Sequence, residues 1–171
     1  MKIEQLRFQL VISVFLTCSG LWTPLIGFTQ CTNNSNIAQE LIEDLSNGDC
    51  IGKYFKSNWT FIYHEYNRCD GSTDGNIDNL NSWQIDSIIK LNVKNDGNGW
   101  ACDTKEPKAY DLEFNLKAII GDWDRFKISN HESHNKSIIY IVGAGESDYL
   151  KLHFNKRNLI VKLEYRSEDP G

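Results

Sequence analysis

The sequence lacks the local signatures that identify most enzymes. It contains no serine nucleophile elbow, no phosphate-cradling glycine loop and no dinucleotide-binding fingerprint. It also lacks an excess of positive charge, because 18 Lys and Arg residues stand against 23 Asp and Glu residues. A nucleic-acid-binding surface needs a basic stripe that releases counterions from phosphates. These absences favour a protein that is not an enzyme and does not bind nucleic acid, although they leave catalysis open.

What the sequence does contain begins with a hydrophobic leader. Lys2 and Arg7 precede an apolar stretch over residues 10–28, as in a signal peptide. Gly27 and Thr29 supply the small residues that favour cleavage after Thr29. An uncleaved anchor is the alternative, weakened by hydroxyl residues and a proline within the stretch. A lipoprotein would need a small residue directly before a cysteine, which the leader does not offer.

Removal of residues 1–29 leaves residues 30–171, a length typical of one domain. We expect this domain to be exported, either secreted or periplasmic, without a transmembrane segment. Four of the five cysteines remain in it, and an even number in an exported chain is ordinarily a disulfide framework. Three connectivities are open, and we favour Cys31 with Cys50 and Cys69 with Cys102, because each pair brackets one local segment. A zinc site of four thiolates would need a C-x-x-C pair, which is absent.

The hydrophobic pattern predicts one helix followed by strands. Apolar residues recur at helical spacing at Ile37, Ala38, Leu41, Ile42 and Leu45. Asn36 can cap this helix, and Gly48 offers a left-handed stop. Most of the later chain alternates with period two, as in strands with one buried face. Residues 80–91 are ambiguous and predict a short helix that leads into a strand near Ile88.

Individual strands follow from this alternation. Residues 59–63 and 110–116 place aromatic and aliphatic side chains on one face, and residues 138–142 form an apolar run suited to a central strand. Residues 150–154 and 159–165 predict a hairpin. The glycine-rich residues 95–99 read as a hairpin turn. A helix that covers a curved antiparallel sheet gives an α+β domain.

The segments 37–55, IAQELIEDLSNGDCIGKYF, and 148–169, DYLKLHFNKRNLIVKLEYRSED, resemble the first helix and last hairpin of the nuclear transport factor two-like superfamily. The resemblance implies a cone-like, cystatin-like fold. The catalytic Asp and Tyr of its isomerase-like relatives have no matching motif here. The alternative fold is a lipocalin-like up-and-down β-barrel.

One segment resembles the calcium loop of an EF-hand. Oxygen-bearing side chains recur at the ligand spacing, a glycine stands at the sharp turn, and Asn81 replaces the bidentate Glu. We expect at most weak calcium binding and no other cofactor. The alternative is a polar loop of Asx turns. The candidate ligands are Asp70, Ser72, Asp74, Asn76 and Asp78.

Two further residues are candidates for ligand binding. His64 lies on an aromatic-rich strand, where a carboxylate such as Asp86 or Asp111 could make it a general base. Trp123 lies in an acidic turn and could line a pocket, although such tryptophans are more often core. His131 and His134 lack the order that a zinc-protease helix needs, which favours a surface loop.

The leading hypothesis is an exported, non-enzymatic binding domain for a small apolar ligand or an envelope protein partner. A small hydrolase or isomerase with a pocket histidine and carboxylate is the first alternative. A calcium-stabilised structural envelope protein is the second.

Overall fold

The computed structural model describes residues 34–123, 125–129, 137–143 and 147–168. The predicted signal peptide, its alternatives, Cys31 and the loop with His131 and His134 lie outside these residues. Among the described residues, no helix has the length and hydropathy needed to cross a membrane.

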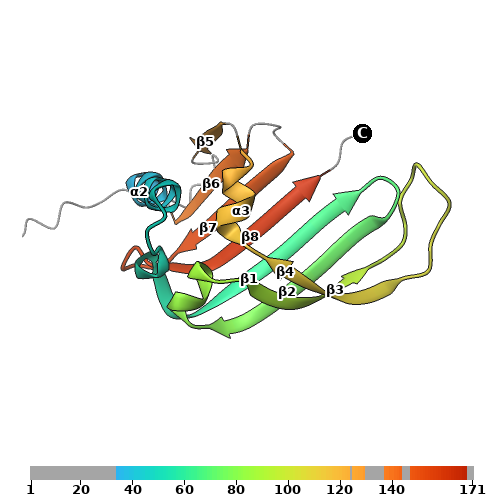
Figure 1. Ribbon diagram of the computed structural model, residues 1–171, viewed down its shortest axis with the longest axis horizontal. Coiled ribbons are helices and arrows are strands. Elements are labelled where there is room, and N and C mark those ends of the chain that lie inside the picture. Colours follow the sequence, from blue (N-terminus) through green and yellow to red (C-terminus); the bar gives the residue numbers. More distant parts are fainter. Residues whose placement is uncertain (1–33, 124, 130–136, 144–146, 169–171) are drawn as a thin grey trace, which may run out of the picture. The chain divides into compact units, whose positions relative to one another are not determined.

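Eight strands form one curved sheet in the order β4-β3-β2-β1-β8-β7-β6-β5 (Figure 1). Neighbouring strands are antiparallel except for β1 and β8, which run parallel at the centre. The chain therefore makes two four-stranded meanders, whose first and last strands meet in the middle. The strands are β1 (Phe55–Asn67), β2 (Gly71–Leu80), β3 (Ile89–Asn95), β4 (Lys108–Phe114), β5 (Phe126–Ser129), β6 (Ile138–Gly143), β7 (Asp148–Phe154) and β8 (Ile160–Glu168).

The sheet is open, because β4 and β5 are its two edges and do not pair with each other. An antiparallel-rich sheet with helices agrees with the predicted α+β class, and the closed lipocalin-like barrel is wrong for the described residues. A barrel needs its first and last strands in the sheet to join. Here the two meanders join through β1 and β8 instead, and the edges stay apart.

The predicted helix is α2 (Asn34–Asn47), and its buried side chains are those that the spacing selects. Asn36 lies inside the first turn of the described helix and does not cap it. Gly48 ends the helix with a φ of 81°, a left-handed conformation that glycine adopts without steric cost. Its N–H donates to the carbonyl of Leu45.

Residues 80–91 form the predicted short helix followed by a strand. A 3-10 helix, η3 (Ser82–Asp86), precedes β3. Asn81 and Gln84 bond reciprocally across its first turn as a capping box. A second 3-10 turn, η2 (Gly52–Tyr54), leads into β1, and α3 (Leu116–Gly121) joins the two meanders.

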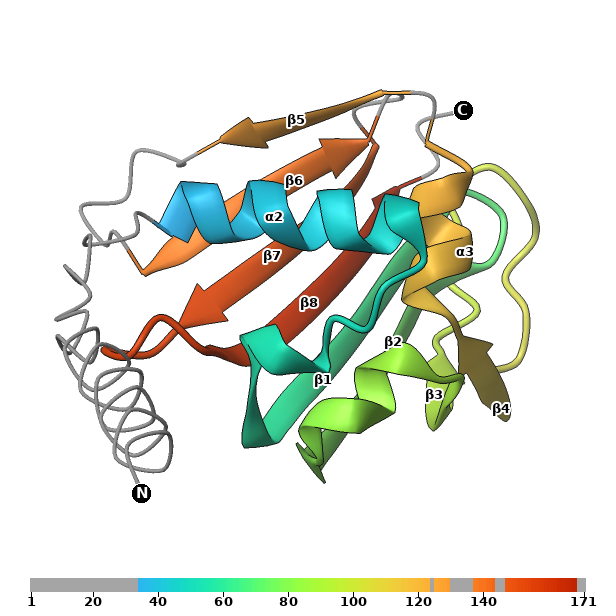
Figure 2. The ribbon, with the colours of Figure 1, turned by 60° about the vertical axis from the view of Figure 1, so that its left-hand side comes forward.

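Both α-helices lie on the same face of the sheet, which we call the inner face (Figure 2). Phe61 of β1 and Leu163 of β8 point to the inner face and are fully buried. α2 contacts β5 and β6, and α3 contacts α2 and η3. The opposite, outer face carries polar side chains such as His64 and Glu164. One apolar core therefore fills the space between the sheet and the helices.

Two local predictions are wrong. The apolar run at 138–142 is β6, which lies next to the edge strand β5 and not at the centre. Its burial alternates, with Ile139 and Ile141 buried and their neighbours half-buried. The glycine-rich residues 95–99 do not close a tight hairpin, because β3 ends at Asn95 and β4 begins only at Lys108. They begin a long segment, residues 96–107, which we call the tethered connection.

Candidate functional site

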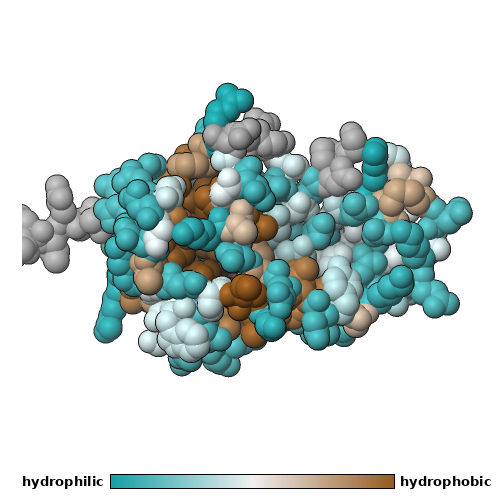
Figure 3. All heavy atoms as spheres, viewed as in Figure 1, coloured by the Kyte–Doolittle hydropathy of each residue, from teal (hydrophilic) through white to brown (hydrophobic). Residues whose placement is uncertain are grey.

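A pocket of about 350 Å³ lies at the end of the first meander, beside the tethered connection. In the space-filling view, apolar side chains gather around α2 and α3, whereas the end of the sheet beside the tethered connection is mostly hydrophilic (Figure 3). The pocket lining is polar apart from one aromatic ring. It consists of Glu65, Asn67, Asp70, Thr73, Asn95, Lys105, Glu106, Lys108 and Tyr110.

The pocket follows one row of register partners across four strands. Glu65 of β1 pairs with Thr73 of β2, Thr73 pairs with Asn95 at the end of β3, and Asn95 pairs with Lys108 of β4. Residues paired in register on antiparallel strands point to the same face. A carboxylate and an amine therefore stand at the two ends of one row, with a hydroxyl and an amide between them.

The floor of the pocket is fixed by hydrogen bonds. Thr73 is 5% exposed, and the Asn95 Nδ2 donates to its Oγ1 at 2.9 Å. In the adjoining row, Gly75 carries no side chain, and a Cβ there would lie 2.7 Å from Val93 Cγ1. The floor of the pocket therefore consists of a glycine and of side chains held in place by hydrogen bonds, where larger side chains would fill the space.

Glu65 is held by a buried tyrosine. The Tyr63 hydroxyl donates to Glu65 Oε2 at 2.5 Å. Burial raises the pKa of Tyr63 well above its ordinary value, so that the hydroxyl keeps its proton. Tyr63 also packs on Tyr165, with ring centroids 5.5 Å apart. The hydrogen bond from Tyr63 fixes one carboxylate oxygen of Glu65, a residue of the pocket lining.

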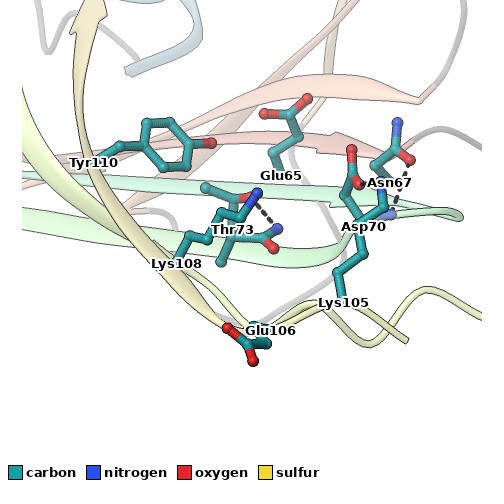
Figure 4. Close-up of a pocket in the computed structure, with 9 residues that line it drawn as sticks. Glu65, Asn67, Asp70, Thr73, Lys105, Glu106, Lys108 and Tyr110 are labelled. Carbon is teal, nitrogen blue, oxygen red and sulfur yellow. Dashed lines mark hydrogen bonds and ion pairs between the residues drawn. The ribbon is translucent and has the colours of Figure 1, made fainter. Parts of the chain in front are cut away.

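The rim of the pocket comes from the turn after β1 and from the tethered connection. Asp70 forms an ion pair with Lys105, and Asn67 Oδ1 accepts hydrogen bonds from the N–H groups of Cys69 and Asp70. Figure 4 shows Lys108 and Tyr110 extending over the floor from β4, while the Glu106 carboxylate points away from the other labelled side chains.

A disulfide anchors the tethered connection. Cys69, just after β1, is bonded to Cys102, as the sequence predicts. Gly97 adopts a φ of 69°, and a Cβ there would lie 2.1 Å from the Lys105 carbonyl oxygen. Gly99 lies so close to Cys69 that a Cβ would come within 2.3 Å of its backbone. The rim is therefore built by covalent and close backbone contacts.

The predicted pairing of Cys31 with Cys50 stays a prediction. Cys31 lies outside the described residues, and Cys50 is exposed and has no disulfide partner within them.

The loop conformation predicted for the calcium site is wrong, because residues 71–80 form the strand β2. Ser72, Asp74, Asn76 and Asp78 are every second residue of the strand, so their side chains form an extended line on one face and cannot wrap around one point. Asp70 is paired with Lys105. The described part of the chain contains no group of three or more His, Cys, Asp or Glu side chains arranged to hold a metal. Weak calcium binding stays a prediction for calorimetric titration, without a preformed cage.

His64 lies on the outer face and does not line the pocket. Its Nδ1 is 2.5 Å from Asp74 Oδ1, and Asp74 is its register partner on β2. The suggested partners are engaged elsewhere. Asp86 accepts from the N–H groups of Ile51 and Gly52, and Asp111 accepts from Asn92. A histidine–aspartate pair exists, but with a different carboxylate from those suggested.

The tryptophans divide between core and surface. Trp123 is half-buried against the core, and its ring lies within 3 Å of the position that a Cβ on Gly143 would take. Trp59 is fully buried, whereas Trp83 and Trp100 are 64% and 71% exposed. Trp123 therefore lies away from the pocket, in the packing role that is the more common one.

The outer face of β7 and β8 holds a cluster of charges around a buried carboxylate. Glu164 is 5% exposed, with His153 Nε2 and Lys162 Nζ at 2.6 and 2.7 Å from its Oε1. Burial acts to raise the pKa of Glu164, but Lys162 and His153 outweigh it and bring the pKa below its ordinary value. Burial lowers the pKa of His153. These side chains bond to one another on the outer face and do not line the pocket.

Sequence reasoning missed most of the pocket residues. One signal was available: Glu65 continues the apolar face of Trp59, Phe61 and Tyr63, where a carboxylate is unexpected. Thr73, Asn95 and Lys108 gave no such signal, because their proximity depends on the pairing of strands. Of the predicted site residues, only Asp70 lines the pocket.

Comparison of the chain with protein-family models, with curated proteins and with solved structures finds no match.

Proposed function

We propose that the protein is an exported binding domain that holds a small polar ligand in the pocket beside the tethered connection. The observation that carries this proposal is the row from Glu65 to Lys108, a set of polar groups on the inner face beyond the apolar core. The volume of about 350 Å³ falls within the range of roughly 300 to 1,000 Å³ that is typical of ligand sites. The polar lining replaces the apolar ligand of the initial hypothesis with a polar one.

Export is part of the proposal. The leader at residues 1–29 resembles a signal peptide, and the Cys69–Cys102 disulfide suits the oxidising conditions of secretion or the periplasm. The proposal also keeps the cone-like relationship to the nuclear transport factor two-like superfamily, supported by α2 and the β7–β8 hairpin in the segments that carry the resemblance.

A binding screen tests the proposed function. The oxidised domain is heated with a library of small polar compounds, and hits are measured by calorimetric titration. We expect hits whose affinity falls in Glu65→Gln, which retains an acceptor oxygen for Tyr63. The matched control is Glu113→Gln on β4, whose carboxylate pairs with Lys90 away from the pocket. Hits that bind both variants equally, or no hits at all, would contradict the proposal.

A second candidate function is general-base catalysis by His64. Its Asp74 partner fixes the orientation of the imidazole, as a carboxylate does in hydrolase dyads. A separate hollow of about 360 Å³ adjoins Asp74 on β1–β3. The test is turnover of an activated ester by the wild type, His64→Gln and the control His153→Gln. Catalysis by this route requires loss in His64→Gln only, and equal rates in all three would exclude it.

A further inference from the structure

The charged groups of the pocket are unequally engaged. Asp70 and Lys105 neutralise each other in an ion pair, and the Glu106 carboxylate points away from the other side chains (Figure 4). Glu65 and Lys108 remain, and neither has an ion-pair partner among the residues that the structure describes. The pocket therefore presents one negative and one positive group that do not satisfy each other.

The register sets the distance between these two groups. Glu65 and Lys108 stand three strands apart in one row. Neighbouring strands lie about 4.8 Å apart, so the two Cα atoms are separated by about 14 Å along a flat sheet. The two side chains extend over part of this span. The rest matches a ligand of a few heavy atoms that lies over Thr73 and Asn95.

From this arrangement, and resting on the proposed function, we infer that the ligand is a small zwitterion, with its ammonium group at Glu65 and its carboxylate at Lys108. Such a molecule supplies both missing counter-charges at once. A ligand with one charge leaves the other protein group without a partner, and a neutral sugar leaves both. Complementary charge then selects the zwitterion over these competitors.

The surroundings of Glu65 suit a cation. One oxygen of the carboxylate accepts from Tyr63, and the carboxylate belongs to the pocket lining, where the second oxygen can accept from an ammonium donor. Tyr110 lines the same pocket, and its hydroxyl end points toward Glu65 (Figure 4). The face of an aromatic ring in the pocket can also contact ammonium groups, including methylated ones. The class therefore includes free α-amino acids and betaines.

The surroundings of Lys108 suit the anionic end. Lys108 is exposed at the start of β4, two residues from Tyr110 on the same face of the strand. Its flexible ammonium group can follow a carboxylate, while the Asn95 amide beside it is already bonded to Ser72, Thr73 and Gly97.

Calorimetric titration tests the inference with matched probes. The panel consists of the free proteinogenic amino acids with their amidated and N-acetylated derivatives, glycine betaine with its amide, and glucose as a neutral sugar. We expect at least one zwitterion to bind, and its amidated and N-acetylated forms to bind about tenfold more weakly or worse. Glu65→Gln should weaken binding of the zwitterion but not binding of its N-acetylated form. Lys108→Met should weaken binding of the zwitterion but not binding of its amidated form.

Controls and failures are separable. The control variants Lys90→Met and Glu113→Gln each remove one charge of an oppositely charged pair on the outer side of β3 and β4. Both variants should leave the affinity for every probe unchanged. The protein could instead bind glucose or a singly charged compound more tightly than any zwitterion and lose this binding in Glu65→Gln. That result would overturn the inference but would still support the proposed function. Absence of binding by this panel overturns the inference, and absence across the whole polar library overturns both.

Discussion

At the β5 and β6 end of the inner face, α2 covers the sheet with buried aliphatic side chains. At the β2 to β4 end, the tethered connection borders the sheet and is held by a disulfide, two close-packed glycines and polar contacts. Aliphatic packing leaves no room for a ligand. Covalent anchoring allows polar groups to stay open to a pocket, because stability at that end does not depend on filling it. The comparison separates a part of the molecule that stabilises the fold from a part that is free to bind.

The largest expected effect belongs to the α2 end. Leu41 is fully buried, and Leu41→Ala should lower the free energy of unfolding by about 4 kcal/mol through lost burial and a cavity. Urea unfolding measures this loss. Under conditions in which the variant remains folded, ligand affinity in the pocket should not change. A changed affinity would show that the two ends are coupled.

Loss of the disulfide should lower both the stability of the domain and its affinity for the ligand. Cys69 and Cys102 are 33 residues apart, and their replacement by Ala should lower the free energy of unfolding by about 3 kcal/mol, mainly by releasing the unfolded chain. Ligand affinity should fall as well, because the tethered connection loses its anchor. Urea unfolding and titration report the two effects. Unchanged affinity in the folded double variant would mean that the disulfide does not shape the pocket.

A smaller effect is expected at the glycines. Gly97→Ala places a side chain on a left-handed residue and against the Lys105 carbonyl, which should cost about 1 to 3 kcal/mol. Gly121→Ala is the matched control, because nothing lies within 4 Å of the added Cβ. Its thermal midpoint should stay level or rise slightly. Equal behaviour of the two variants would refute the tight packing of the connection.

The smallest effect concerns the outer face and depends on pH. Burial keeps the pKa of His153 below its ordinary value of 6.5. As the pH falls through this value, His153 therefore binds a proton in the unfolded chain before it does so in the folded chain. Stability should therefore fall as the pH drops below about 6.5, and His153→Gln should remove this part of the fall. Below about 4.5, protonation of Glu164 should add a second loss. Urea unfolding from pH 8 to 4 records both, and an unaltered profile in His153→Gln would contradict the assignment.

Local patterns in the sequence were sufficient for the helix and for most strands. The five apolar residues of α2 are spaced for one helix face, and Leu150, Leu152 and Phe154 alternate on β7 in the predicted hairpin. These patterns depend on neighbours in the sequence, so they can be recognised without the fold. The Cys69–Cys102 pair was predictable for the same reason, since it brackets a single segment.

Non-local pairing explains what the sequence could not show. The parallel contact of β1 with β8 joins the two ends of the domain and leaves no local trace. The segment of β2 is rich in Gly, Asp and Asn, residues that disfavour strands, and it becomes a strand because β1 and β3 pair with its two sides. The same pairing brings Glu65 into one row with Lys108. The sequence alone therefore cannot show this site, whereas the spacing of acidic residues in β2 does resemble a calcium loop.

The central claim is that binding occurs at the tethered end of the inner face. Amide chemical shifts of the labelled domain, followed during titration with the tightest compound from the screen, locate the contact directly. The account predicts that signals from residues 65–73 and 95–110 move in proportion to saturation, and that those of α2 stay in place. Shifts confined to α2, β5 and β6 would place the ligand at the other end and contradict it.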